Sequence, residues 1–312
     1  YYNPAYLGGM DKDRVYYSQS EGWHTDGYED ENNNQLIERT SDLFWGVNEK
    51  REGKAQGYLY PIGSRFGLGV EMTTASWGDS VVKDTGLSVY EQKGNQFTNY
   101  SGGSLQAGFA LTSAASLGVG VSAARLEREY FTQFTNPNYI QESATAFGGF
   151  VGAVLRNRSG NLVWDILASW STEPQYWFDQ DTMDFSRFAA PVYVEQTLTA
   201  SFFDGKAFVA LKQVNDIFPD RATWYGRLMP VAEVWLFNMV ALRAGAEGSI
   251  VMRDGSSELG WGATGGLSLK IWKISVDANY TLRQRPSRSL QEVVVPESIF
   301  FFSVSAEGLL RN

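Results

Sequence analysis

A period of two dominates the sequence and constrains its fold more than any other feature. In residues 65–72 every second side chain is apolar, from Phe66 to Met72, and those between are glycine or charged. The same alternation returns in residues 161–170 and 274–282. Successive side chains of a β-strand point to opposite faces, so this pattern predicts strands with one apolar and one polar face. We therefore expect an all-β fold.

The connections between these strands alternate between short and long. Six short connections stand near residues 63, 114, 159, 204, 238 and 272. Longer polar stretches separate them, at 24–53, 78–102, 131–142, 176–191, 218–222, 254–259 and 284–296. An up-and-down meander whose two ends meet different environments sorts its connections in this way, whereas a sandwich has no reason to. The pattern predicts an antiparallel up-and-down transmembrane β-barrel with all its short turns at one rim.

Fourteen strands follow from this spacing. Their expected spans are 13–22, 54–62, 64–77, 103–113, 115–130, 143–157, 161–175, 192–203, 206–217, 223–238, 240–253, 260–271, 273–283 and 297–308. A tilted strand needs about 9 to 11 residues to cross a bilayer, which these spans supply. We interpret residues 83–94 as a hairpin extension within a long loop. Counting them and residues 42–48 as wall strands gives the alternative of 16 strands.

Composition excludes several classes of protein. The 312 residues include no run of about 18 apolar residues, so a helical membrane protein is excluded. The absence of cysteine removes disulfides, thiol nucleophiles and cysteine-based zinc sites. A formal net charge of -9 argues against nucleic acid as a partner, because neutralising phosphates needs a basic surface.

The apolar face of the strands is expected to meet the lipid bilayer, and the polar face to line the lumen. Leu162, Ile166, Val276 and Ala278 are predicted to face lipid. Tryptophans at strand ends are expected to form interfacial girdles; they are Trp77, Trp170, Trp177, Trp224, Trp261 and Trp272. Proline cannot donate to a strand ladder, so Pro230 predicts a bulge in residues 223–238.

Charges of both signs fall on the polar phase of the strands. The candidate lumen charges are Glu71, Arg156, Asp165, Arg227, Glu233, Arg243 and Glu247, with Glu195, Lys270 and Asp277 in the same phase. Two interpretations stay open for them. They pair with one another across the wall, or those on residues 223–238 and 240–253 hold a segment inside the lumen.

The chain opens on Asn3-Pro4-Ala5, just ahead of the first expected strand. Proline fixes its own φ and disfavours the helical region for the residue before it, so this tripeptide is an extended or turn element. Together with the stretches 58–72, 104–127, 229–248 and 299–310, it resembles the FadL superfamily of outer-membrane barrels. That superfamily includes fatty-acid and aromatic-hydrocarbon transporters and the PorV/PorQ-like proteins of type IX secretion.

The resemblance implies fourteen strands and a short N-terminal segment that folds into the lumen. Residues 1–12, with Asn3, Pro4 and Ala5, would then form a plug, and residues 13–312 the barrel. The implied location is the outer membrane of a Gram-negative bacterium. The implied function is passive uptake of hydrophobic small molecules through the plugged lumen. The alternative is a PorV-like accessory barrel that docks a secretion or surface protein complex through its extracellular loops.

Groups for catalysis or metal binding are scarce. His24 is the one histidine and lies in a polar stretch with Asp26, Glu29, Asp30 and Glu31. These carboxylates lack the spaced ligands and closing glutamate of a calcium loop. The sequence predicts no enzyme, no cofactor and no metal.

Overall fold

The computed structural model of the protein describes residues 3–23, 45–84, 90–132, 138–173, 175–179, 184–219, 223–253, 256–286 and 294–308. Its elements are η1 (Pro4–Leu7), β1 (Arg14–Trp23), β2 (Trp45–Ile62), β3 (Phe66–Asp84), β4 (Tyr90–Ala110), β5 (Ala115–Thr132), β6 (Asn138–Arg156), β7 (Leu162–Ser171), β8 (Gln175–Asp179), β9 (Asp184–Phe188), β10 (Val192–Phe202), β11 (Ala207–Phe218), β12 (Thr223–Leu236), β13 (Val240–Arg253), β14 (Ser256–Ile271), β15 (Ile274–Pro286) and β16 (Val294–Glu307).

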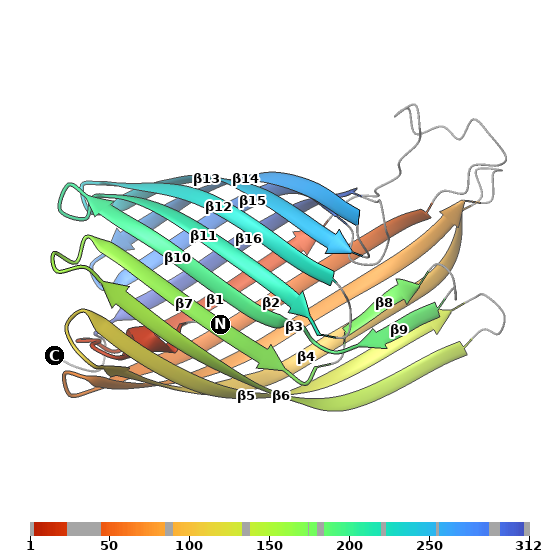
Figure 1. The fold of residues 1–312 in the computed structure, drawn as a ribbon, viewed down its shortest axis with the longest axis horizontal. Helices are drawn as coiled ribbons and strands as arrows, with labels where there is room; N and C mark the ends of the chain where they lie inside the picture. Colours follow the sequence, from red (N-terminus) through yellow and green to blue (C-terminus); the bar gives the residue numbers. More distant parts are fainter. Residues whose placement is uncertain are drawn as a thin grey trace.

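Within the described residues, fourteen antiparallel strands close into a barrel, and β8 and β9 form a separate two-stranded sheet (Figure 1). Each wall strand pairs with its neighbours along the chain, and β1 pairs with β16 to close the cylinder. The predicted up-and-down barrel of fourteen strands is confirmed. The alternative of sixteen is wrong, because residues 83–94 largely prolong β3 and β4, and the described part of residues 42–48 prolongs β2.

One side of the barrel is taller than the other. Strands β2 to β6 have 18 to 21 residues, whereas β7, β10 and β11 have 10 to 12. Most of the polar stretches at 78–102 and 131–142, expected to be loops, are therefore strand. Ladder hydrogen bonds continue where the apolar alternation ends, because they join backbone groups and do not require a lipid-facing side chain.

The six short turns lie at one rim, which we call the short-turn rim, as the spacing predicts (Figure 1). Trp272 and Lys273 alone join β14 to β15, and Trp272 has a φ of 56°. Such left-handed turns match the twist of the flanking strands. The amide of Gly308 donates to the carbonyl of Asp13 at 2.8 Å, so the end of β16 lies beside the start of β1 at this rim. We call the opposite end the long-loop rim.

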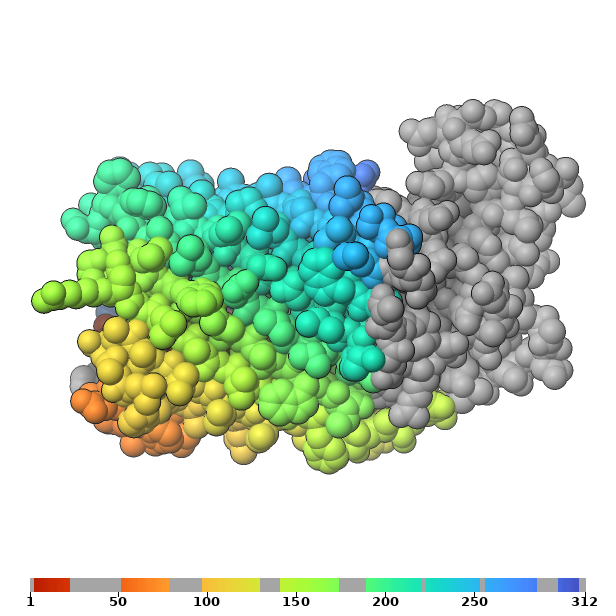
Figure 2. Space-filling view, viewed as in Figure 1, coloured from red at the N-terminus to blue at the C-terminus, as the bar shows by residue number. Residues whose placement is uncertain are grey.

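Apolar side chains cover the outer face over much of its height. Leu105 and Val121 are each 62% exposed, and Leu162 is 41% exposed. The strand alternation places Ile166, Val276 and Ala278 on the same outer face. Figure 2 shows the outer surface over β5–β7 and β10–β12, where the colours of successive strands run in oblique stripes. This apolar band is typical of a barrel whose outside meets hydrocarbon.

Three of the tryptophans expected at strand ends, Trp170, Trp261 and Trp272, are exposed on the outside. Trp77 is an exception to the prediction, because it shares the inner phase of β3 with Glu71 and lines a cavity in the lumen. No helix among the described residues is long and apolar enough to cross a membrane.

The bulge expected at Pro230 is absent. Leu228 pairs with Gly248 and Val231 with Gly245, so the register is the same on both sides of the proline. Pairing between β12 and β13 lapses at the two positions between. Proline removes one donor from the ladder but inserts no extra residue, so the strand keeps its phase.

Candidate functional site

The N-terminal segment forms a short 3-10 turn, η1, against the inner face of the barrel. The side chain of Asn3 accepts a hydrogen bond from the amide of Ala5 at 3.0 Å. Its Nδ2 donates to the carbonyls of Ala153 at 3.4 Å and Ile166 at 3.1 Å. Pro4 stands where a turn leaves its first amides unpaired, so its missing N–H costs nothing. Asn3 thus joins the segment to β6 and β7.

Four glycines make room for this segment. A Cβ added at Gly67, Gly108, Gly118 or Gly152 would lie less than 3.0 Å from atoms of residues 3–8, a separation that real side chains do not show. These glycines come from β3, β4, β5 and β6 in turn. We call this part of the wall the glycine sector. Ala5 and Leu7 are fully buried there.

Two predicted lumen charges contact the segment through Tyr6. The Tyr6 hydroxyl donates to Oδ2 of Asp165 at 3.1 Å. The guanidinium carbon of Arg156 lies 5.9 Å from the Tyr6 ring centroid. The Ser116 hydroxyl also donates to the carbonyl of Gly8, at 3.2 Å. The hydrogen bonds described between the segment and the wall go to β5, β6 and β7, rather than to the charges on residues 223–238 and 240–253.

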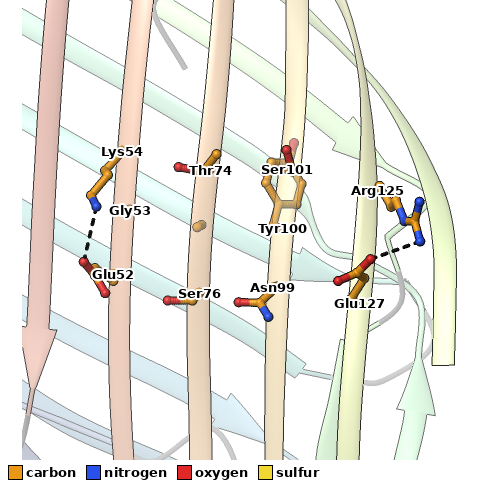
Figure 3. A pocket seen from close by; sticks show the side chains of 11 residues that line it. Glu52, Gly53, Lys54, Thr74, Ser76, Asn99, Tyr100, Ser101, Arg125 and Glu127 are labelled. Atoms are coloured by element: carbon orange, nitrogen blue, oxygen red, sulfur yellow. Dashed lines mark ion pairs between the residues drawn. The ribbon is translucent and has the colours of Figure 1, made fainter. Parts of the chain in front are cut away.

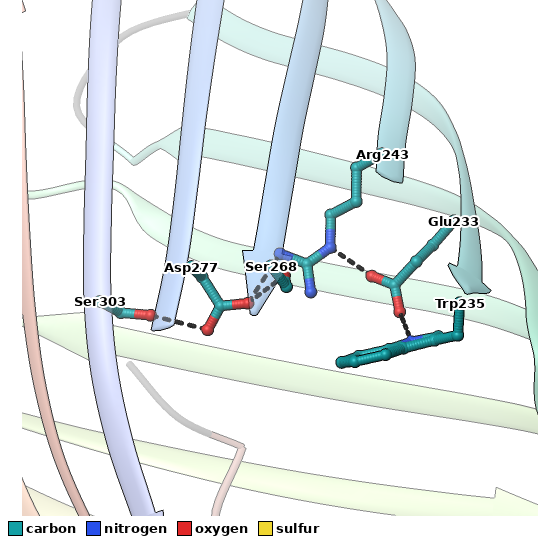
Figure 4. Close-up of polar contacts among 6 residues, drawn as sticks. All are labelled: Glu233, Trp235, Arg243, Ser268, Asp277 and Ser303. Carbon is teal, nitrogen blue, oxygen red and sulfur yellow. Dashed lines mark hydrogen bonds and ion pairs between the residues drawn. The ribbon is translucent and has the colours of Figure 1, made fainter. Parts of the chain in front are cut away.

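Those charges instead form ion pairs along the wall. Arg243 binds Glu233 on the next strand, and its Nη1 lies 3.0 Å from Oδ1 of Asp277 (Figure 4). Hydroxyls of Ser268 and Ser303 donate to the Asp277 carboxylate. The inner face of β12 to β16, which we call the charged sector, therefore carries linked charges of both signs.

A second ion-pair group in the charged sector centres on Arg283. Its Nη1 lies 3.3 Å from Oε1 of Glu247, and its Nε binds Glu297. The Arg283 side chain is 9% exposed and that of Glu297 is 3% exposed. Glu247 was a predicted lumen charge, but both of its companions were missed. Continuing the alternation of β15 from Asp277 would have placed Arg283 on the same face.

Three of the remaining predicted charges, Arg227, Glu195 and Glu71, have local partners, whereas Lys270 is exposed. Arg227 lies over the Tyr225 ring, 5.5 Å from its centroid. Lys212 pairs with Glu195 at 2.8 Å. Glu71 is 7% exposed and accepts hydrogen bonds from the hydroxyls of Tyr16 and Thr73.

A cavity of about 630 Å³ lies in the lumen, against β15, β16 and β1 to β4. Aromatic, apolar and charged side chains line it together, among them Tyr16, Trp77, Tyr100, Phe301, Leu59 and Glu71. Leu59 also lies beside Leu7, because a Cβ on Gly69 would contact both. The cavity thus adjoins the N-terminal segment at its short-turn side.

Glu173 lines the same cavity and lies two residues beyond Ser171, the last residue of β7, at the long-loop rim. Burial raises the pKa of its carboxyl from 4.5 to about 7, and the charge of Arg128 partly opposes that rise. The charge of Glu173 therefore changes close to neutral pH.

A groove of about 480 Å³ runs over the outer face of β1 to β3, β15 and β16. Apolar side chains of β1, β3, β15 and β16 line it, including Val15, Val70 and Ile274. Tyr16 and Ser305 border both this groove and the lumen cavity. A single layer of wall thus separates the two spaces.

A polar patch occupies the outer face of the tall strands. Lys54 pairs with Glu52 at 3.7 Å and Arg125 with Glu127 at 3.0 Å, on either side of Thr74, Ser76, Asn99 and Ser101 (Figure 3). On each strand this patch lies nearer the long-loop rim than the apolar band. The tall strands therefore continue past the apolar band with a polar outer surface.

His24, Asp26, Glu29, Asp30 and Glu31 lie outside the described residues. Among the residues that are described, no group of three or more histidines, cysteines or carboxylates is placed to hold a metal ion.

Comparisons with known proteins identify the fold. No protein-family model and no curated protein matches the sequence. A solved FadL homologue of Pseudomonas aeruginosa superposes with a TM-score of 0.66 at 13% identity, covering 98% of this chain and 92% of that one. The toluene transporter TodX of Pseudomonas putida superposes with a TM-score of 0.62 at 12% identity, covering 98% and 92%. The chain therefore has the FadL-like barrel fold, as the sequence resemblance suggested.

Proposed function

We propose that the protein is a bacterial outer-membrane channel for passive uptake of hydrophobic small molecules, with residues 1–12 as its plug. The fold is that of a toluene transporter and a FadL homologue. The apolar band on the outer face supports a place in the membrane. The four glycines that admit residues 3–8 support a plug that is seated in the wall rather than loose in the lumen.

The observation that carries this proposal is the pair of spaces sharing Tyr16 and Ser305. The lumen cavity offers aromatic and aliphatic surface to an apolar molecule, and the outer groove opens onto the hydrocarbon band. A molecule that moves between them passes from the aromatic and aliphatic side chains of the cavity to those of the groove. β1 pairs continuously with both β2 and β16, so such passage requires one of these two seams to open. We propose the β1–β2 seam, because residues of β2 line both spaces, Ala55 and Leu59 the cavity and Gln56 and Tyr58 the groove.

The seam can be closed reversibly. Ser18 and Ala55 are directly opposed on β1 and β2 and both line the cavity, and the chain has no cysteine. We expect the pair Ser18→Cys and Ala55→Cys to form a disulfide on oxidation, because opposed Cα atoms of antiparallel strands are about 4.5–5.5 Å apart, within the Cα separations that disulfides span. Uptake of a radiolabelled monoaromatic hydrocarbon into cells should fall when the disulfide forms and return on reduction.

The matched control is the pair Thr199→Cys and Ala210→Cys, opposed on the inner face of β10 and β11. This disulfide stiffens the barrel but leaves the β1–β2 seam free, so uptake should not change. Removing residues 3–12 should raise leakage of small solutes in both backgrounds. Unchanged uptake with the oxidised β1–β2 pair, together with unchanged leakage after the deletion, would exclude the proposed route.

A second function, docking of a secretion or surface protein complex, is favoured by the polar patch on the tall strands. Charges that stand clear of the apolar band are available to a partner protein. Reversing both ion pairs, with Lys54→Glu, Glu52→Lys, Arg125→Glu and Glu127→Arg, keeps the net charge. Loss of a cross-linked partner from cells with unchanged hydrocarbon uptake would favour docking through this surface.

A further inference from the structure

We propose that the lumen cavity selects hydrophobic molecules that carry a positive charge, such as an aryl- or alkylammonium ion, and discriminates against hydrophobic carboxylates. This inference rests on the proposed function, because it names the class of molecule that the same cavity accepts.

Glu71 is the centre of this inference. Its side chain lines the cavity and is 7% exposed. Its carboxylate accepts hydrogen bonds from the hydroxyls of Tyr16 and Thr73, and within the described residues it forms no ion pair. A buried carboxylate is stabilised most by a cation, and neutral hydroxyls supply only part of that stabilisation. The site therefore lacks a positive charge that a ligand can supply.

The other charges at the cavity are already matched or negative. Arg14 is ion-paired with Glu307, which stands opposite it on β16. Asp277 is ion-paired with Arg243. The two carboxyl groups left are those of Glu71 and Glu173. Burial raises the pKa of Glu173 to about 7 and the charge of Arg128 acts on it, so the unmatched negative charge of the cavity comes mainly from Glu71.

The remaining wall suits the rest of an ammonium ligand. Tyr16, Trp77, Tyr100 and Phe301 line the cavity. Aromatic rings attract cations through their quadrupoles and also bury apolar surface. A hydrophobic carboxylate would meet the same rings, but its charge would lie near Glu71 in surroundings that screen less than water does. The cavity wall therefore accommodates the apolar part of both the ammonium ion and the carboxylate, and discriminates between the two ligands by their charge.

Three ligands with one apolar body test this selectivity. They are 4-phenylbutylammonium, 4-phenylbutyrate and the neutral 4-phenylbutanol. Binding to the purified protein in zwitterionic nanodiscs would be measured by calorimetry at about pH 7.5, where the amine and the acid are both charged. Empty nanodiscs correct for partition into lipid. We expect the ammonium ion to bind about tenfold more tightly than the alcohol, and the carboxylate more weakly than the alcohol.

Two variants locate the effect. Glu71→Gln keeps the size of the side chain and should abolish the preference for the ammonium ion while leaving the affinity for the alcohol unchanged. Glu195→Gln removes a lumen carboxylate that does not line the cavity, so the preference should persist. If both variants lost the preference for the ammonium ion equally, the preference would come from the overall negative potential of the lumen. That result would overturn the role proposed for Glu71.

The possible outcomes distinguish failure of the charge selectivity from failure of the proposed uptake function. Equal binding of all three ligands, or tighter binding of the carboxylate, overturns the charge selectivity and leaves a hydrophobic channel standing. Binding of none of the three overturns both.

Discussion

The glycine sector and the charged sector line the same lumen with opposite chemistry. In the glycine sector, β3 to β6 present bare backbone to residues 3–8, and contact is made to main-chain atoms. In the charged sector, β12 to β16 present arginine and carboxylate side chains that bind one another. The glycine sector binds a segment of the chain, whereas the charged side chains of the charged sector bind one another.

The two sectors should respond differently to substitutions. Glycines let the N-terminal segment lie directly against the backbone of the wall. Its position therefore requires that no side chain is present at these glycines. Buried ion pairs depend on side chains that are present, and removing one partner leaves a charge without compensation. Damage to the charged sector should therefore reach the barrel itself, whereas damage to the glycine sector should reach only the segment.

The largest expected effect is in the charged sector. Arg283→Met leaves Glu247 and Glu297 buried without their cation, which should lower the free energy of unfolding by about 3–5 kcal/mol. Urea unfolding in detergent, followed by tryptophan fluorescence, measures this loss. Arg125→Met is the control, because its pair with Glu127 is exposed and should contribute less than about 1 kcal/mol. Equal losses would contradict the role given to burial.

The next effect is in the glycine sector. Gly118→Val places side-chain atoms where Pro4 and Ala5 lie, and should weaken the attachment of the segment by about 1–3 kcal/mol. Added protease should then cleave within residues 1–12, while the unfolding of the barrel is unchanged. Gly248→Val is the control, since nothing lies within 4 Å of its added Cβ. A segment that stays protected in Gly118→Val would break the comparison.

Glu173 gives a pH dependence at the long-loop rim. Its folded pKa of about 7 exceeds the ordinary 4.5, so the stability it contributes is full below about pH 4.5 and is lost as the pH rises through 7. Glu173→Gln should therefore match the parent at low pH and be more stable by on the order of 2 kcal/mol at about pH 8. Unfolding measured across this pH range checks the sign. A parent that gains stability over the same interval would refute it.

The smallest effect is at Asn3. Asn3→Ala removes the hydrogen bonds to Ala153, Ile166 and Ala5, and should cost about 1 kcal/mol in the attachment of the segment. Leakage of small solutes from vesicles should rise, with the barrel still folded. Tyr6→Phe, which removes only the hydroxyl bound to Asp165, should leak less. Equal leakage in the parent and in Asn3→Ala would show that Asn3 does not hold the segment.

Much of the barrel follows from local pattern. The alternation from Phe66 to Met72 predicts which face of β3 is apolar, because side-chain direction along a strand has a fixed period. The same rule, continued along β15 from Asp277, places Arg283 on the inner face. Strand length was underestimated for β2 to β6, because the apolar pattern marks contact with hydrocarbon and the backbone ladder does not need it.

The sequence by itself determined the all-β class, the fourteen strands, the short-turn rim and the inward phase of charges such as Asp165, because these depend on neighbours in the chain. Only the tertiary structure decided that Tyr6 meets Asp165, 159 residues away, and that Gly118 faces Ala5. It also placed Trp77 in the lumen cavity and Arg14 opposite Glu307. These contacts arise when the sheet closes and β1 meets β16. Closure fixes which inward side chains share a height in the lumen, and no local spacing in the sequence records it.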